Sequence, residues 1–311
     1  MPTTSRPPAV LRLPPHRSVL RLGPGSRLFG LHPGASVAVD DLPEALAEML
    51  DELDGAVERS ALVQRAVRRG ADAGAAEALL AELVHAGVLV DAGDLDRRAG
   101  RRAASTVVVA GDGPLAVGIV LGLARSGVGT VHTHTSGTVL AADIGTGYVD
   151  ADRGRDRLAA TAGALRALCP GRSTTAPPLR VVPDLVVLAD ALAPDPVQVA
   201  QLHTAATAHL PAALRDGVGV VGPLVLPGRT ACLGCLELHR CARDPSRPTV
   251  AAQLAGRRGS ADPACVSATV ALATAQAVAA LDGTTTGGGV PPTLDATLEI
   301  DPTAGTVIRR L

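Results

Sequence analysis

Hydrophobic and polar positions change their spacing near residue 92 and again near residue 105, and these changes divide the chain into three regions. In the first region, short apolar runs typical of strands alternate with stretches that have the spacing of helices. The strand-like runs cover residues 10–13, 18–22, 27–31, 35–39 and 88–90. Helical spacing covers residues 41–54, 57–70 and 72–86. Small β-elements, three helices and a last β-wing predict a winged-helix α+β domain over residues 1–92.

The first of these helices carries a local start signal. Asp41 is followed by Glu44 three residues later, which is the spacing of a capping box. Leu46, Met49 and Leu50 then fall on one face of the predicted helix. We therefore expect Asp41 to cap this helix and its apolar face to enter the core.

The second region, residues 93–104, is a short basic segment. It contains four arginines within six residues: Arg97, Arg98, Arg101 and Arg102. A charge run of this kind is typical of a solvated linker, which is our interpretation. Contact with phosphate groups is the alternative.

In the third region, residues 105–311, buried strands alternate with helices. Predicted strands cover residues 106–110, 128–133, 184–189, 209–214, 218–226 and 293–300. Predicted helices cover residues 115–126, 155–169, 197–207 and 265–281, and a Thr/Gly spacer at 284–289 precedes the last strand. This alternation predicts an α/β domain whose mainly parallel sheet carries helices on both faces.

Composition narrows the functions that the chain can have. Hydrophobic residues make up 47% and charged residues 19%, which favours a sizeable core and excludes general disorder. The net charge of −1 gives no general attraction to nucleic acid or to an anionic membrane. The sequence has no Trp, one Tyr and one Phe, so a base-stacking surface is excluded. It also has no Lys and no Asn, which excludes mechanisms that require a catalytic lysine or asparagine.

Cysteine usage and the start of the chain predict a cytoplasmic location. Residues 1–8 contain no apolar segment of the secretory type. The longest apolar run, residues 265–281, is interrupted by Ser, Thr and Gln and predicts a buried helix with no role in a membrane. Five cysteines, an odd number, favour metal or thiol chemistry in a reducing compartment.

A glycine-rich turn is the first candidate site. Gly111, Gly113 and Ala116 form a G-x-G-x-x-A pattern directly after a predicted strand and at the start of a helix. Glycines in this context let backbone N–H groups approach a phosphate at the helix N-terminus. Pro114 removes one donor and Asp112 adds a negative charge, so a turn kept only for packing is the other interpretation.

A cysteine pair is the second candidate site. Cys232 and Cys235 have the C-x-x-C spacing that presents two thiolates to one tetrahedral zinc ion. A structural zinc site needs two further ligands, and Cys241, Cys265 and His239 are the candidates. Buried free thiols or a redox pair are the alternatives.

Three blocks of the sequence resemble the E1-like superfamily of ThiF/MoeB/HesA adenylyltransferases: residues 107–129, 184–189 and 216–239. The last block is the most specific, since a strand, a Gly-Pro turn and the cysteine pair follow one another. The whole chain is most similar to actinobacterial ThiF-like proteins that carry an N-terminal winged helix of the peptide-clamp type. The resemblance implies a Rossmann-like E1 domain, zinc, ATP with Mg²⁺, and a dimer.

The sequence departs from this family at its ATP-binding residues. Active members use an acidic residue after the second strand, then Asn, Arg and Lys. The matching loop, residues 133–140, has no carboxylate and no arginine. We therefore expect too little positive charge for adenylation. No cysteine aligns as a sulfur acceptor, so no catalytic residue is assigned.

Three functions follow from these observations. The first is a non-adenylating scaffold that binds the leader of a ribosomally made peptide for a partner enzyme such as a cyclodehydratase. The peptide would extend a sheet beside the third helix, and the expected contacts are Val19, Leu20, Arg21, Leu28, Leu80 and Val84. The second is an active adenylyltransferase that acts on a ubiquitin-like or sulfur-carrier protein. The third is a winged-helix DNA-binding regulator.

Overall fold

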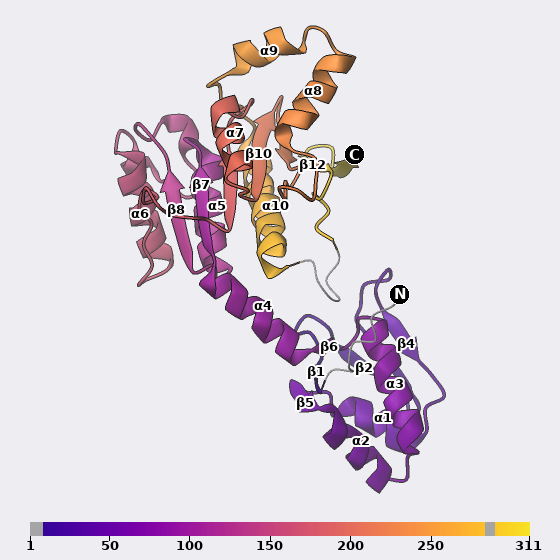
Figure 1. Cartoon of the computed structure of the whole chain (residues 1–311). Helices are drawn as coiled ribbons and strands as arrows, with labels where there is room; N and C mark the ends of the chain where they lie inside the picture. The colour runs from indigo at the N-terminus through magenta and orange to yellow at the C-terminus, as the bar shows by residue number, and fades with distance from the viewer. Residues whose placement is uncertain (1–8, 284–289) are drawn as a thin grey trace. The chain divides into compact units, whose positions relative to one another are not determined.

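A computed structural model describes residues 9–283 and 290–311, so the predicted Thr/Gly spacer at 284–289 lies outside the described residues. The chain divides into two compact units, residues 1–98 and 99–311 (Figure 1). The division falls inside α4 (Ala92–Ala104), so the segment predicted to be a linker is helical.

The basic residues of α4 are held by acceptors of the same chain. Arg98 Nη2 lies 2.6 Å from Asp94 Oδ2, and Arg97 contacts the same carboxylate. Arg102 Nε lies 2.9 Å from Asp282 Oδ1, and Arg101 donates to the Asp282 carbonyl. Because these side chains have internal partners, the structure gives no support to the phosphate-contacting alternative.

The N-terminal unit combines three helices with two small antiparallel sheets. One sheet has the order β5-β1-β6 and the other has the order β2-β3-β4. The strands are β1 (Val10–Arg12), β2 (Val19–Gly23), β3 (Ser26–Phe29), β4 (Val37–Val39), β5 (Ala56–Glu58) and β6 (Val90–Asp91). The helices are α1 (Glu44–Asp51), α2 (Arg59–Arg68) and α3 (Ala73–His85). The assignment of this α+β unit as a winged helix stays a prediction.

The start of α1 differs from the expected capping box. Pro43 is the N-cap residue, no side chain caps the helix, and Asp41 has a left-handed φ of 55°. The chain turns at Asp41 because the next amide, that of Leu42, donates to the Gly25 carbonyl. The capping-box prediction was therefore wrong, since local spacing competes here with a contact to the β2–β3 turn.

Arg27 fixes that turn to α1. The side chain is 3% exposed, and its Nε and Nη2 donate to the two oxygens of Asp51 at 2.7 and 2.8 Å. Its Nη1 donates to the carbonyls of Gly23, Pro24 and Ser26 at 3.0 to 3.2 Å. Hydrogen bonding to Asp51 raises the pKa of Arg27, and the same bond lowers the pKa of Asp51. One guanidinium thus joins the hairpin to the helix through five hydrogen bonds.

The C-terminal unit is built on a seven-stranded sheet with the order β13-β12-β11-β10-β9-β7-β8 (Figure 1). The strands are β7 (Thr106–Ala110), β8 (Thr130–His134), β9 (Leu185–Ala189), β10 (His209–Arg215), β11 (Val218–Val221), β12 (Thr297–Asp301) and β13 (Thr306–Arg310). Strands β8, β7, β9 and β10 pair in parallel, and the pairs from β10 to β13 are antiparallel. Five strands therefore run in one direction and only β11 and β13 oppose them, which confirms a mainly parallel sheet.

Helices cover both faces of this sheet, as predicted. On one face, α5 (Pro114–Arg125) and α10 (Pro263–Asp282) pack on β7 and β9 to β12. On the other face, α7 (Pro196–Thr204) and α8 (Leu233–Arg243) contribute Val199, Leu202 and Leu233 to a second cluster. Two more helices, α6 (Arg157–Leu168) and α9 (Arg247–Leu254), complete the unit.

The contact between α5 and α10 depends on small residues. A Cβ atom on Gly118 would lie 2.7 Å from Val270 Cγ2, and one on Gly122 would lie 2.5 Å from Thr274 Oγ1. By length and composition alone, α10 is apolar enough to cross a membrane. Its buried residues, such as Cys265, Ala273 and Ala277, instead belong to the core of this unit. The prediction of a buried helix at this position is confirmed.

Candidate functional site

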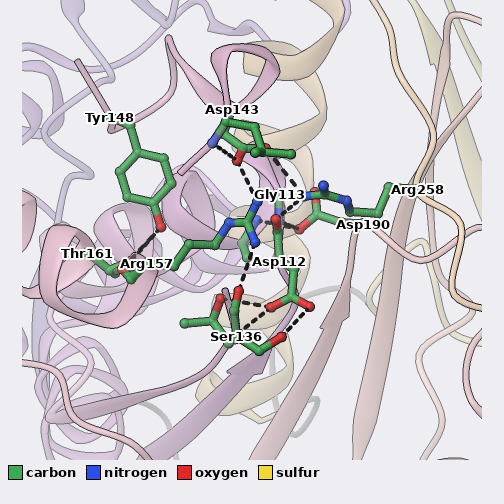
Figure 2. A network of polar contacts seen from close by, with 12 residues as sticks. Asp112, Gly113, Ser136, Asp143, Tyr148, Arg157, Thr161, Asp190 and Arg258 are labelled. Atoms are coloured by element: carbon green, nitrogen blue, oxygen red, sulfur yellow. Dashed lines mark hydrogen bonds and ion pairs between the residues drawn. The ribbon is translucent and has the colours of Figure 1, made fainter. Parts of the chain in front are cut away.

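The site lies at the carboxyl ends of the parallel strands, where the strand order reverses. From β7 the chain passes through α5 to β8 on one side, and β9 then pairs with the other side of β7. In open α/β sheets, ligands bind in the crevice at such a switch point. Five charged residues meet here, and we call them the switch-point cluster: Asp112, Asp143, Arg157, Asp190 and Arg258 (Figure 2).

Asp190 occupies the N-terminus of α5. Its Oδ2 accepts hydrogen bonds from the amides of Gly113 and Ala116 at 2.9 and 3.2 Å, and its Oδ1 accepts one from the Leu115 amide at 3.0 Å. The residue is 3% exposed and follows β9 with a left-handed φ of 73°. The backbone donors that a bound phosphate would use at this turn are therefore engaged by the protein's own carboxylate.

The two glycines of the turn make room for this carboxylate. A Cβ atom on Gly111 would lie 2.8 Å from Asp190 Oδ2, and one on Gly113 would lie 2.6 Å from Asp190 Oδ1. The predicted residues Gly111, Gly113 and Ala116 thus surround Asp190: the amides of Gly113 and Ala116 donate to it, and Gly111 abuts it. Their spacing is explained by close approach of an internal group, without any bound nucleotide.

Burial dominates the ionisation of Asp190. It raises the pKa of this carboxyl to about 6, against the lowering effect of the three amide hydrogen bonds. At neutral pH the group is still mostly ionised, so a negative charge lies at the positive end of the α5 dipole. This charge is where an anionic ligand would have to bind.

Asp112 adds a second carboxylate at the tip of the same turn. Its Oδ1 accepts from the Ser136 amide at 2.6 Å and from Thr135 Oγ1 at 2.9 Å, and its Oδ2 accepts from Ser136 Oγ at 3.1 Å. Burial raises the pKa of Asp112, but these hydrogen bonds outweigh burial and the net pKa is lower than usual. The polar residues of the loop after β8 are therefore used to hold an internal charge.

Two arginines reach the cluster from distant parts of the chain. Arg157 Nη2 lies 2.7 Å from Asp143 Oδ2, and its Nη1 donates to the Ser136 carbonyl at 2.8 Å (Figure 2). Arg258 Nη1 lies 3.3 Å from Asp143 Oδ1 and also donates to the Asp112 carbonyl. Asp143 is 1% exposed. The sequence predicted almost no positively charged side chains at this site, and that prediction was wrong, because two arginines lie there. Both of them, however, form ion pairs with Asp143.

Four residues of the cluster were not predicted from the sequence: Asp143, Arg157, Asp190 and Arg258. Each lies far in sequence from the glycine turn, and Asp190 is 77 residues from Gly113. The one available signal was the position of Asp190 directly after a buried parallel strand.

The cysteine pair lies at the start of α8. Cys232 is the N-cap residue, its Sγ accepts from the Cys235 amide at 3.3 Å, and the two Sγ atoms are 3.4 Å apart. Of the proposed further ligands, Cys265 is buried in α10, where its Sγ lies near Thr269. In the described residues, no three His, Cys, Asp or Glu side chains are grouped closely enough to hold a metal. The pair therefore does not fit a complete tetrahedral zinc site.

The residues predicted to contact a peptide lie in the N-terminal unit. Leu20 and Arg21 on β2 are exposed, whereas Val19 and Leu28 are partly buried. Val84 packs against the core, and Leu80 is 0% exposed within it. Leu80 therefore cannot contact a peptide, because its side chain faces the interior of the three-helix core. Strand β2 pairs only with β3, so its other edge has no strand neighbour among the described residues.

Comparisons with known proteins identify the fold. No protein-family model matches the sequence, and no curated protein matches it. Solved structures of E. coli MccB match 97% of this chain and 96% of their own, with TM-scores of 0.74. One is the microcin C7 biosynthetic enzyme MccB with N-formylated MccA (14% identity), and another is MccB with ATP (15% identity). PaaA matches at a TM-score of 0.63 and 16% identity over 95% of this chain and 98% of its own. The chain therefore has the Rossmann-like E1 fold of MccB.

Proposed function

We propose that this protein is a non-adenylating member of the E1-like superfamily that binds the leader of a ribosomally made peptide and presents it to a modifying enzyme. The observation that supports this most directly is the carboxylate of Asp190 on the N-terminal amides of α5. An ATP phosphate at this turn would meet a negative charge and no free amide on Gly113, Leu115 or Ala116. Adenylation depends on positive groups and oriented donors at the transferring phosphate.

The charged side chains at the switch point support the same proposal. Arg157 and Arg258 both form ion pairs with Asp143, and the sequence offers no lysine or asparagine to replace them. Each oriented donor is worth about 3 kcal/mol in a reaction that builds up charge. Without several such donors, adenylation would be slower by many powers of ten.

The open edge of β2 supports the peptide-binding part. An extended peptide can add a strand to such an edge through main-chain hydrogen bonds, and alternate side chains then give specificity. Leu20 and Leu22 lie two residues apart on β2 and are 39% and 60% exposed. A bulge interrupts the β2–β3 register between Arg21 and Gly23, and both leucines are exposed beside this edge, where they offer apolar contacts to the peptide. The MccB structure that contains N-formylated MccA shows this fold beside a peptide.

An active adenylyltransferase is the second candidate. It is favoured by the match over nearly the whole chain to MccB solved with ATP. DNA binding is not proposed, because three of the four arginines that it would use in residues 57–70 are paired: Arg59 with Glu77, and Arg65 and Arg69 with Glu52.

Calorimetric titration with Mg-ATP separates the two candidates. We expect no saturable heat from the wild-type chain, and none with AMP, because Asp190 holds the phosphate position. Saturable binding in the micromolar range would overturn the non-adenylating proposal and favour the adenylyltransferase.

Peptide binding is tested with fluorescein-labelled synthetic peptides that span any short reading frames found next to the gene of this protein. Fluorescence polarisation should show saturable binding, which Leu22→Glu weakens at least about tenfold, equivalent to about 1.4 kcal/mol. Val307→Glu on β13 is the matched control, because Val307 is also 60% exposed on a strand, in the other unit. Equal affinity of the wild type and Leu22→Glu would contradict binding at β2.

A further inference from the structure

The cysteine pair at the start of α8 has a use that does not depend on the proposed function. Cys232 Sγ and Cys235 Sγ lie 3.4 Å apart, at contact distance. A disulfide needs a separation of about 2.05 Å, so closure requires movement of little more than 1 Å. Two residues of one helical turn can make this movement by rotating their side chains.

The surroundings of the pair favour thiol chemistry over zinc. A structural zinc site is closed by four ligands, and the described residues bring no third or fourth ligand to these thiols. Cys235 is exposed, and no residue of α8 is buried, so solution reagents reach this turn. The other thiols differ, because Cys265 is buried in the core and none of the three forms a second C-x-x-C pair.

The polar environment activates one of the two thiols. Cys232 is the N-cap residue of α8, and its Sγ accepts a hydrogen bond from the Cys235 amide at 3.3 Å. A thiolate is the attacking species in thiol–disulfide exchange, and the N-terminus of a helix stabilises it. Cys232 is therefore the expected nucleophile and Cys235 the resolving thiol.

We infer that Cys232 and Cys235 form a redox-active dithiol that cycles to an intramolecular disulfide by exchange with a low-molecular-weight disulfide. Cys232 thiolate attacks one sulfur of the oxidant, forms a mixed disulfide and releases one small thiolate. Cys235, after losing its proton to solvent, attacks Cys232 Sγ and releases the second small thiolate. The protein loses two electrons and two protons, and the small disulfide becomes two thiols.

The test uses the purified full-length chain and mixtures of oxidised and reduced glutathione. Mass spectrometry after alkylation should show a loss of two hydrogens on the peptide that contains both cysteines. Cys235→Ser should stop the reaction at the mixed disulfide and retain one glutathionyl group on Cys232.

Cys241→Ser is the matched control, since it removes a thiol from the same helix and should leave the disulfide yield unchanged. The inference is overturned if the pair stays reduced while free Cys241 is glutathionylated. It is also overturned if the protein purifies with one equivalent of zinc that Cys232→Ser removes.

Discussion

The two units differ in whether the backbone amides at their candidate sites have a partner within the protein. In the C-terminal unit, the amides at the start of α5 are engaged by Asp190, and the nearby arginines are engaged by Asp143. In the N-terminal unit, the ion pair of Arg27 and Asp51 joins the β2–β3 hairpin to α1. The edge of β2 that faces away from β3 has no strand partner among the described residues. The amides of the glycine turn are thus occupied by an internal carboxylate, whereas one edge of β2 has no strand neighbour among the described residues.

This contrast shows that a recognisable turn does not by itself indicate a ligand. The G-x-G-x-x-A pattern of residues 111–116 satisfies the local requirements of a phosphate loop. Its glycines also satisfy the requirements of a buried aspartate that approaches the backbone closely. Which group occupies the turn is decided by a residue on another strand.

The largest loss of stability is expected when Asp143 is removed from the switch-point cluster of the C-terminal unit. Asp143→Ala should lower the free energy of unfolding of the C-terminal unit by about 4 kcal/mol, because it leaves two guanidiniums, one of them buried, without a counter-charge. Urea unfolding followed by fluorescence of Tyr148, the one tyrosine, reports on this unit. Asp150→Ala is the control, because its ion pair with Arg153 is exposed and should contribute less than about 1 kcal/mol. Equal losses in the two variants would contradict this account.

The position of the β2–β3 hairpin in the N-terminal unit depends on Arg27. Arg27→Ala should cost about 3 kcal/mol, somewhat less than Asp143→Ala, since Arg21 remains 2.7 Å from Asp51. Hydrogen exchange measured by mass spectrometry should show a loss of protection over residues 19–29. Arg21→Ala removes an exposed partner of the same carboxylate and should leave this protection nearly unchanged. If both variants exchange like the wild type, the hairpin is held by its apolar contacts alone.

A smaller effect is expected from the ionisation of Asp190. The pKa of Asp190 is about 6 in the folded protein, against an ordinary value of 3.8 in the unfolded chain. The folded state therefore favours the protonated carboxyl. The stability that this preference contributes is complete below pH 3.8 and is lost as the pH rises through 6. Compared with Asp190→Asn, the wild type should therefore lose about 2 kcal/mol of relative stability between pH 4 and pH 7. Parallel pH profiles of the two proteins, measured by urea unfolding, would show that the carboxyl is not perturbed.

Much of the fold could be predicted from local pattern. The strand at residues 106–110 was predicted with its observed bounds, and the helix that follows was predicted within one residue, because most residues of both are apolar and buried. Helices α8 and α9 were missed, and neither contains a buried residue. Strand β13 was also missed, and all five of its residues are exposed.

The candidate site was predictable only in part. Gly111 and Gly113 are neighbours in sequence, and their spacing alone identified the turn. Asp190 and Arg258 contact that turn from 77 and 146 residues away, so only the sheet order and the crossing segment bring them there. Partners at such separations leave no periodic signal in a single sequence.

Asp190 acts on its own turn as a tethered competitor of any free anion. A group on a short flexible linker has an effective concentration in the millimolar range, and a side chain held by three hydrogen bonds exceeds it. Dialysis and dilution cannot lower this concentration, because the competitor is part of the chain. Any free anion must therefore displace this carboxylate to reach the amides of the turn, which lowers the apparent affinity of the turn for that anion at every concentration.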